Sequence, residues 1–260
     1  MAVTNFIQTI WSKKIQDDLE LKCKLVDNCL RDYEGDCKYA RTVKILGVGE
    51  PTIGDYTGAD IEIEEMSDRG QELTIDQQKY FAFYVDDVNQ AQSVPGLREE
   101  YQRKAVHGLA VARDTYVAEL IQNATNKTTV TMTEEGFKKG VDEAIVALRN
   151  RNFDEEGVIE ITPAGYNLFK NHLITLSTNN PEYIKKGIVG MYDNMEVIMS
   201  NNLKTPGCVR GKKAIAFAGQ INEVEALRAE KKFKDIIRGL DTFGAKVIDE
   251  NRIQVLVASA

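Results

Sequence analysis

The chain has 260 residues, of which 43% are hydrophobic and 28% are charged, a balance that is ordinary for a globular protein with a sizeable core. Its formal net charge of −7 argues against a protein whose main task is to grip nucleic acid. No apolar run is long enough to cross a bilayer, and the first residues lack the basic start and apolar block of a secretion signal.

The first 32 residues read as an arm. Phe6, Ile7, Ile10 and Trp11 form an apolar cluster, and a short helical pattern follows it. The cluster can close the protein's own core or dock on a neighbouring molecule, and the sequence leaves both interpretations open.

Residues 33–88 have the character of an extended β segment. A β-rich stretch at 41–48 precedes glycines that break the chain repeatedly, and residues 60–64 then alternate apolar and acidic side chains. A ribbon of two or three strands is marginal in water and needs something to lie on. Alternation also predicts that the side chains of 80–85 face two ways, with Phe81, Phe83 and Val85 opposite Tyr80, Ala82 and Tyr84.

The stretch from Pro95 to Thr125 predicts one long amphipathic helix, capped by Ser93 and with Pro95 in its first turn. The expected buried face recurs every three or four residues and consists of Leu97, Tyr101, Ala105, Gly108, Leu109, Ala112, Tyr116, Leu120 and Ala124. Expected on other faces are Arg98, Glu99, Arg103, Arg113, Asp114 and Gln122. A large charged residue at Ala112 should therefore unfold the protein, whereas a change at Arg113 should be tolerated.

Helices and short strands are expected to follow. Thr133 caps a predicted helix that continues through Arg149, and Thr162 with Pro163 starts another that ends near Leu176. The first of these has its apolar positions at Phe137, Val141, Ala144, Ile145 and Leu148. Buried strands are expected at 157–161, 197–199, 214–217, 245–248 and 253–257, and the stretch 223–238 is strongly charged.

No candidate for chemistry sits in an arrangement that specifies a reaction. The glycine-rich stretch 47–54 follows a strand, but it lacks the GK[ST] ending and the following helix of a phosphate loop, so turn glycines are the better interpretation. Asp76, Asp86 and Asp87 form a candidate metal or acid–base set, although acidic pairs before helices are usually solvated helix starts. His107 lies on or beside the apolar face of the predicted long helix, where a packed histidine is expected rather than a catalytic one. We predict no catalytic, cofactor-binding or metal-binding residue.

The four cysteines, Cys23, Cys29, Cys37 and Cys208, form no CxxC motif. Because the chain has only two histidines, the spacing does not indicate a zinc site. Reduced thiols in a cytosolic product are the expectation.

Five stretches, taken together and in order, are distinctive: MAVTNFIQTIWSKKI at the start, RDYEGD at 31–36, TVKILGVGEPTIGDYTG at 42–58, DQQKYFAFYVDDVNQAQ at 76–92 and TFGAKVIDENRIQVL at 242–256. They resemble the major capsid proteins of tailed bacteriophages, and the resemblance covers nearly the whole chain. Encapsulins, the shell proteins of bacterial nanocompartments, share this fold type.

The resemblance implies an α+β coat fold with named parts. These are an N-terminal arm (1–32), an extended β-loop (33–86), a peripheral domain with a long spine helix (87–133), an axial domain (134–222), and a return through the peripheral domain to a final axial strand (223–260). Because the chain starts directly at the arm, the resemblance also implies a separate scaffolding protein or one that is removed entirely.

The function implied is structural: a self-assembling subunit, in pentamers and hexamers, of the icosahedral head shell around a double-stranded DNA genome. It is expected to be no enzyme and to need no cofactor. Expected partners are other copies, scaffolding and portal proteins, and packaged DNA held weakly and non-specifically, with no membrane contact. The protein is expected to assemble in the host cytoplasm and to reside in the virion.

Two alternatives stay open. One is an encapsulin-type nanocompartment shell protein, and the other is a soluble α/β enzyme whose Asp76, Asp86 and Asp87 bind a metal.

The segment Glu50 to Asp76, which we call the acidic segment, has Arg69 as its only base. We expect it to lie across an adjacent subunit and meet basic side chains there.

Overall fold

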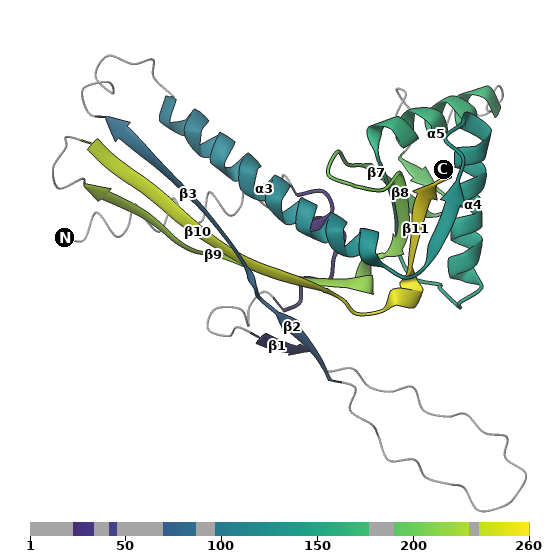
Figure 1. Cartoon of the computed structure of the whole chain (residues 1–260), viewed down its shortest axis with the longest axis horizontal. Helices are drawn as coiled ribbons and strands as arrows, with labels where there is room; N and C mark the ends of the chain where they lie inside the picture. Colours follow the sequence, from purple (N-terminus) through teal and green to yellow (C-terminus); the bar gives the residue numbers. More distant parts are fainter. Residues whose placement is uncertain are drawn as a thin grey trace, which may run out of the picture.

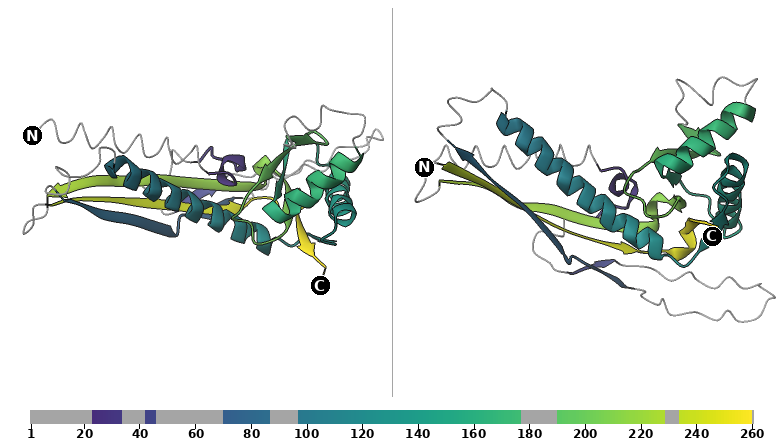
Figure 2. Two further views of the ribbon diagram at one scale, coloured as in Figure 1. Left: turned by 90° about the horizontal axis from the view of Figure 1, so that it is seen from above. Right: turned by 45° about the horizontal axis from the view of Figure 1, so that its top comes forward.

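The computed structural model describes residues 23–33, 42–45, 70–86, 97–176, 190–228 and 234–259. They form an α+β fold with two bodies (Figure 1). The long body has a three-stranded sheet with one long helix beside it, and the compact body has a six-stranded sheet with two helices (Figure 2). Several predictions lie outside the described residues: those on the first 22 residues, the glycine-rich stretch 47–54, most of the acidic segment, Ser93 and Pro95.

Three antiparallel strands form the sheet of the long body: β3 (Gln77–Asp86), β9 (Ile215–Arg228) and β10 (Lys234–Val247), in the order β3-β10-β9. The sequence predicted only short strands at 214–217 and 245–248, whereas both β9 and β10 have 14 residues. A sheet covered on one face needs apolar side chains only at every second position, so charged residues do not interrupt it. Ile237 is buried, for example, while the adjacent Arg238 is exposed.

A small antiparallel ladder of β1 (Thr42–Ile45) and β2 (Gln71–Thr74) packs on the base of this sheet. Val43 and Leu73 of the ladder form one hydrophobic cluster with Ala216 and Ala218 of β9. Phe217 between them belongs to the core under the long helix. Since successive side chains of a strand point to opposite faces, the ladder covers the face of β9 that is turned away from the helix.

The long helix is α3 (Leu97–Asn123), within the predicted range, but its buried face differs from the predicted one. Gly108 and Tyr101 are exposed, and Ala112 is only half-buried. The buried positions in the described turns are Val106, Leu109, Ala110, Arg113, Asp114, Val117, Ala118 and Ile121. The expectation that Arg113 and Asp114 face away from the core was therefore wrong.

The buried side chain of Arg113 explains the rotation of the helix. Its Nε donates a 2.9 Å hydrogen bond to Asp241 Oδ2, and its Nη2 bonds the other carboxylate oxygen. Phe217 and Phe243 lie beside the guanidinium, with ring centroids 5.6 and 5.9 Å from its central carbon. Side chains on β10 and β9 thus supply both a counter-charge and an aromatic surface, and Arg113 packs there as a core residue.

The compact body confirms most of the predicted elements. Its sheet has the order β4-β11-β8-β5-β7-β6. The strands are β4 (Lys127–Val130), β5 (Gly157–Ile161), β6 (Met191–Tyr192), β7 (Met195–Met199), β8 (Gly207–Gly211) and β11 (Ile253–Ala258). Its helices are α4 (Glu134–Arg149) and α5 (Pro163–Leu176).

Both helix starts follow the predicted capping chemistry. The hydroxyl of Thr133 accepts a hydrogen bond from the Gly136 N–H at 3.2 Å, and that of Thr162 accepts one from the Gly165 N–H at 3.3 Å. All five predicted apolar positions of α4 are buried. None of the helices in the described ranges is both long and apolar enough to cross a membrane.

We predict that Arg113→Ala lowers the free energy of unfolding by ~3–5 kcal/mol, because it leaves the Asp241 carboxylate buried without its partner. The double variant Arg113→Met, Asp241→Leu should recover most of that loss, since an apolar pair leaves no charge behind. Urea denaturation measures both. Lys204→Ala is the control, because it breaks an exposed pair with Glu119 on the same helix. A loss at Arg113 no larger than at Lys204 would contradict the prediction.

Candidate functional site

The carboxylates proposed as a metal set do not come together. Asp76 precedes β3 and accepts a 3.2 Å hydrogen bond from the Tyr116 hydroxyl, whereas Asp86 is the last residue of that strand. Ten residues of extended chain separate them by ~33 Å. Asp87 lies outside the described residues. Among the described residues, no group of three or more histidine, cysteine or acidic side chains is placed to hold a metal ion.

His107, expected to pack beside the buried face of the long helix, is exposed instead. The cause is the rotation of α3 that follows from burying Arg113. Three of the cysteines are buried and free, namely Cys23, Cys29 and Cys208, while Cys37 lies outside the described part of the chain. These thiols lie in the hydrophobic core of the long body and its junction with the compact body.

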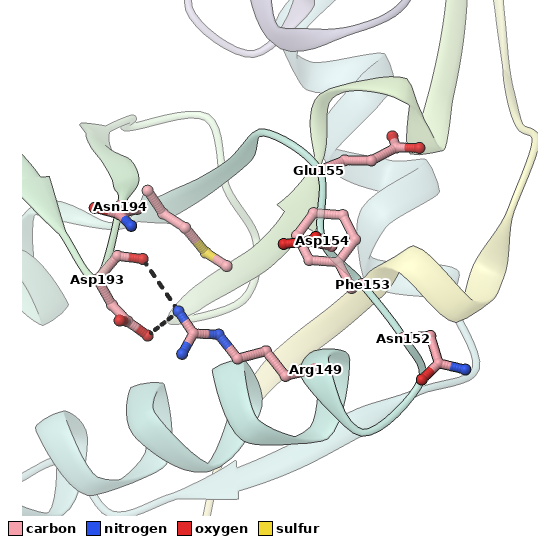
Figure 3. Close-up of a pocket in the computed structure, with 8 residues that line it drawn as sticks. Arg149, Asn152, Phe153, Asp154, Glu155, Asp193 and Asn194 are labelled. Atoms are coloured by element: carbon pink, nitrogen blue, oxygen red, sulfur yellow. Dashed lines mark hydrogen bonds and ion pairs between the residues drawn. The ribbon is translucent and has the colours of Figure 1, made fainter.

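A pocket of about 600 Å³ lies in the compact body, between the end of α4 and the β6–β7 turn (Figure 3). Arg149 crosses it and pairs with Asp193, with 2.8 Å between Nη2 and Oδ2. Asn152, Asp193 and Asn194 have positive φ, which these residue types adopt in tight turns. Its lining is Arg149, Asn152, Phe153, Asp154, Glu155, Asp193, Asn194 and Met195. The lining offers no nucleophile beside a base, so it supports no recognisable catalytic arrangement.

An exposed aromatic face is the most distinctive surface of the long body. The side chains of β3 alternate as predicted: Phe81 and Phe83 pack toward the core, while Tyr80 and Tyr84 are 80% and 68% exposed. Phe83 stacks on Tyr101 of α3 with the ring centroids 5.8 Å apart, so the two exposed tyrosines lie on the face turned away from the helix.

β10 extends this face across the sheet. Tyr80 lies opposite Leu240, Ala82 opposite Arg238, and Tyr84 opposite Ile236. We call these six residues the aromatic face. The sequence indicated the β3 half by its alternation, but it missed the β10 half because strand pairing joins residues about 150 positions apart. Large tyrosines exposed beside a leucine and an arginine are typical of protein contact surfaces.

The likeness of this chain to known proteins lies in its fold. No family model and no curated protein matches the sequence. A solved chain from Mycobacterium phage Che8 matches with a TM-score of 0.75 and 25% sequence identity, over 90% of each chain. A chain in the capsid structure of the cyanophage P-SCSP1u matches with a TM-score of 0.73 and 15% identity, over 89% of this chain and 86% of that one.

This chain has the phage capsid fold. The capsid fold also relates it to the virus-like particle of Pyrococcus furiosus, with a TM-score of 0.62 and 11% identity over 96% of this chain and 99% of that one. A capsid fold that matches along almost the entire length includes both bodies, so neither body is an addition to the fold.

We predict that the three buried thiols do not react in the native protein. Burial raises the pKa of Cys29 to about 11 and that of Cys23 to about 12, and it raises the pKa of Cys208 further. At pH 8 these thiols are protonated and shielded, and the thiolate is the reactive form. In a Cys37→Ser background, Ellman's reagent should find no fast thiol in native protein and three in guanidinium chloride. Rapid reaction of the native protein would contradict this.

The same shifts predict how stability depends on alkaline pH. The unfolded thiols lose their protons near pH 9, whereas the folded ones keep theirs up to about pH 11. The unfolded state therefore binds fewer protons in this window, and the free energy of unfolding should fall as pH rises through it. Urea midpoints measured from pH 8 to 11 test this, and replacing Cys29 by Ala should reduce the slope.

Proposed function

We propose that the chain is the major capsid protein of a tailed phage, a structural subunit that assembles into the icosahedral head shell around the double-stranded DNA genome. The match to the Mycobacterium phage Che8 chain, over 90% of both chains at 25% identity, carries this proposal. The cyanophage chain belongs to a capsid structure, and a third matching chain, with a TM-score of 0.64, belongs to the mature capsid of bacteriophage PhiM1. The protein would assemble in the host cytoplasm and reside in the virion.

The two bodies support a division into functional parts. The long body with α3 serves as the peripheral domain and its spine helix, and the compact body serves as the axial domain. Pairing of β3 with β10 across ten residues, and of β9 with β10, favours moving 77–86 and 215–222 into the peripheral domain. The arm remains 1–32 and the extended β-loop becomes 33–76, while β11 completes the axial sheet beside β4 and β8.

Shell closure requires one subunit to make several repeated contacts, in rings of five and six. The aromatic face is one such contact, because tyrosine and arginine contribute strongly at interfaces. Each contact can be weak, since many act together in a closed shell. Scaffolding and portal proteins are further partners, and DNA is confined with weak contacts, in keeping with 33 basic and 40 acidic residues.

The acidic segment provides a second contact in this proposal. Ile45 lies opposite Gln71 at the end of the β1–β2 ladder, so the two ends that the intervening stretch joins lie side by side. We propose that this excursion crosses onto a neighbouring copy and meets basic side chains there. Exposed ion pairs contribute only ~0–1 kcal/mol each, but a shell repeats them at every contact.

A nanocompartment shell is the second candidate, and the Pyrococcus furiosus virus-like particle favours it because 96% of this chain and 99% of that one are covered. The lower TM-score of 0.62, against 0.75 for the phage chain, favours the phage head. The metal-dependent enzyme has no comparable support, because Asp76 and Asp86 stand at opposite ends of a strand.

Electron microscopy of the purified protein tests the proposed function. We predict closed shells of uniform size in at least one of two preparations, one of the protein alone and one co-expressed with a scaffolding protein. Small soluble oligomers under both conditions would contradict it. Portal and terminase genes beside this gene would support the phage head, and a cargo-enzyme gene would support the nanocompartment.

We predict that Tyr80→Asp with Tyr84→Asp abolishes shells and leaves the subunit folded, because both side chains are exposed and the charges oppose burial in a contact. Circular dichroism reports the fold, and sedimentation reports the particle. Tyr80→Phe with Tyr84→Phe is the matched control, since it keeps the aromatic area. Full-size shells from the aspartate variant would remove the aromatic face from the set of contacts.

A further inference from the structure

The segment from Cys23 to Leu30 lies where the two bodies meet, and it includes the short 3₁₀ turn η1 (Val26–Asn28). Leu25 and Val26 are buried there in the core that also contains the α3 side chains. At its end, Leu30 bridges to the start of β9: its N–H donates to the Ile215 carbonyl at 2.8 Å, and its carbonyl accepts from the Phe217 N–H at 2.9 Å.

Asp114 fastens this segment to the long body. Its carboxylate accepts hydrogen bonds from the backbone N–H groups of Lys24, Leu25 and Val26, at 3.0, 3.1 and 3.3 Å. Asn202 adds a weaker contact at 3.4 Å. The side chain is 2% exposed. Charge-assisted bonds to three successive amides hold the backbone in one conformation.

Arg210 fastens the same segment to the compact body. It lies on β8 and donates from Nη2 to the Leu25 carbonyl at 2.9 Å and from Nη1 to the Asn28 carbonyl at 2.7 Å. Its Nε and Nη2 also donate to Glu160 of β5, at 3.0 and 2.7 Å. Both side chains are fully buried, so the segment supplies two of the partners of a buried cation.

The segment therefore adds polar links between two bodies that also share apolar contacts, since Cys208, Ile253 and Val255 lie in one hydrophobic cluster with the α3 side chains. Within the described residues, the chain crosses between the bodies from α3 to β4, from β8 to β9 through η3 (Lys212–Ala214), and from β10 to β11 through η4 (Glu250–Arg252). If the segment leaves, Asp114 and Arg210 lose partners while they are buried, and such loss is costly. Intermediate positions are thus disfavoured, and the segment is either seated or released.

We propose that Cys23–Leu30 is a strap that fixes the angle between the long and compact bodies, with Asp114 and Arg210 as its two fastenings. Release of the strap lets that angle change. The use of such a change, to fit one subunit into rings of five and of six, rests on the proposed function. The fixing of the angle does not depend on it, because every contact lies within one chain.

The test combines two measurements on the full-length chain. Asp114→Asn keeps the shape but replaces one acceptor oxygen by a donor group, so amide exchange at Lys24, Leu25 and Val26 should accelerate by about tenfold or more.

Spin labels at Tyr84→Cys on β3 and Val146→Cys on α4, in a Cys37→Ser background, report the angle between the two bodies through the distance between the labels. The distance distribution should be narrow with Asp114 present and broad in the Asp114→Asn variant.

Asp193→Asn is the matched control, because it makes the same substitution at an exposed carboxylate whose partner, Arg149, lies in the same body. It should leave both readouts unchanged. Faster amide exchange with an unchanged distance distribution would overturn the proposal. The segment would then be held by Asp114 without fixing the angle between the two bodies. Unchanged exchange would overturn it too, by removing Asp114 as a fastening.

If Asp114→Asn does not fold, Lys24→Ala decides the question. Lys24 Nζ donates to the Met199 carbonyl at 3.1 Å in an exposed contact between the strap and β7. Its loss should move both readouts in the same direction by a smaller amount, and no movement would overturn the proposal. Diluting labelled with unlabelled chains keeps the distances intramolecular. Failure to form shells would contradict the proposed function and leave this result unaffected.

Discussion

Buried charge governs how the parts of this molecule fit together. Arg113 pairs with Asp241 beneath the long helix, and Arg210 pairs with Glu160 inside the six-stranded sheet. Each buried charge is costly without a partner of good geometry, so the positions of the partners restrict where α3 and β8 can lie. Apolar contacts alone would tolerate small rotations of a helix on a sheet. A guanidinium that must reach a carboxylate and also pack beside aromatic rings selects one rotation.

The layering of the long body decides which surfaces remain open. With α3 over one face of the three-stranded sheet and the β1–β2 ladder over the base of the other, the aromatic face stays exposed farther along the strands. A sheet with one uncovered face normally turns polar side chains outward. The proposed function accounts for exposed tyrosines in that place, because a shell subunit would bury such side chains in its contacts.

The molecule carries its function in shape more than in reactive groups. The described cysteines are buried, with pKa values raised by burial, and the candidate carboxylates Asp76 and Asp86 are far apart. The likeness of this chain to other proteins is of the same kind, because it lies in the fold and not in a recognisable sequence pattern. Many different residues can build one arrangement of layers, provided that the apolar patterning and the buried pairs are satisfied.

The sequence by itself determined the local elements. Periodicity and capping residues located α3, α4 and α5, and two-residue alternation separated Phe81 and Phe83 from Tyr80 and Tyr84, because these signals depend only on neighbours in the chain. Only the tertiary structure decided that Arg113 is buried, that β9 and β10 are long, and that residues 23–30 join two bodies. Each of these depends on a partner about 90 or more residues away or on strand pairing. A local pattern cannot tell whether a charged side chain will meet its counter-charge, and that meeting determines whether the side chain is buried or exposed.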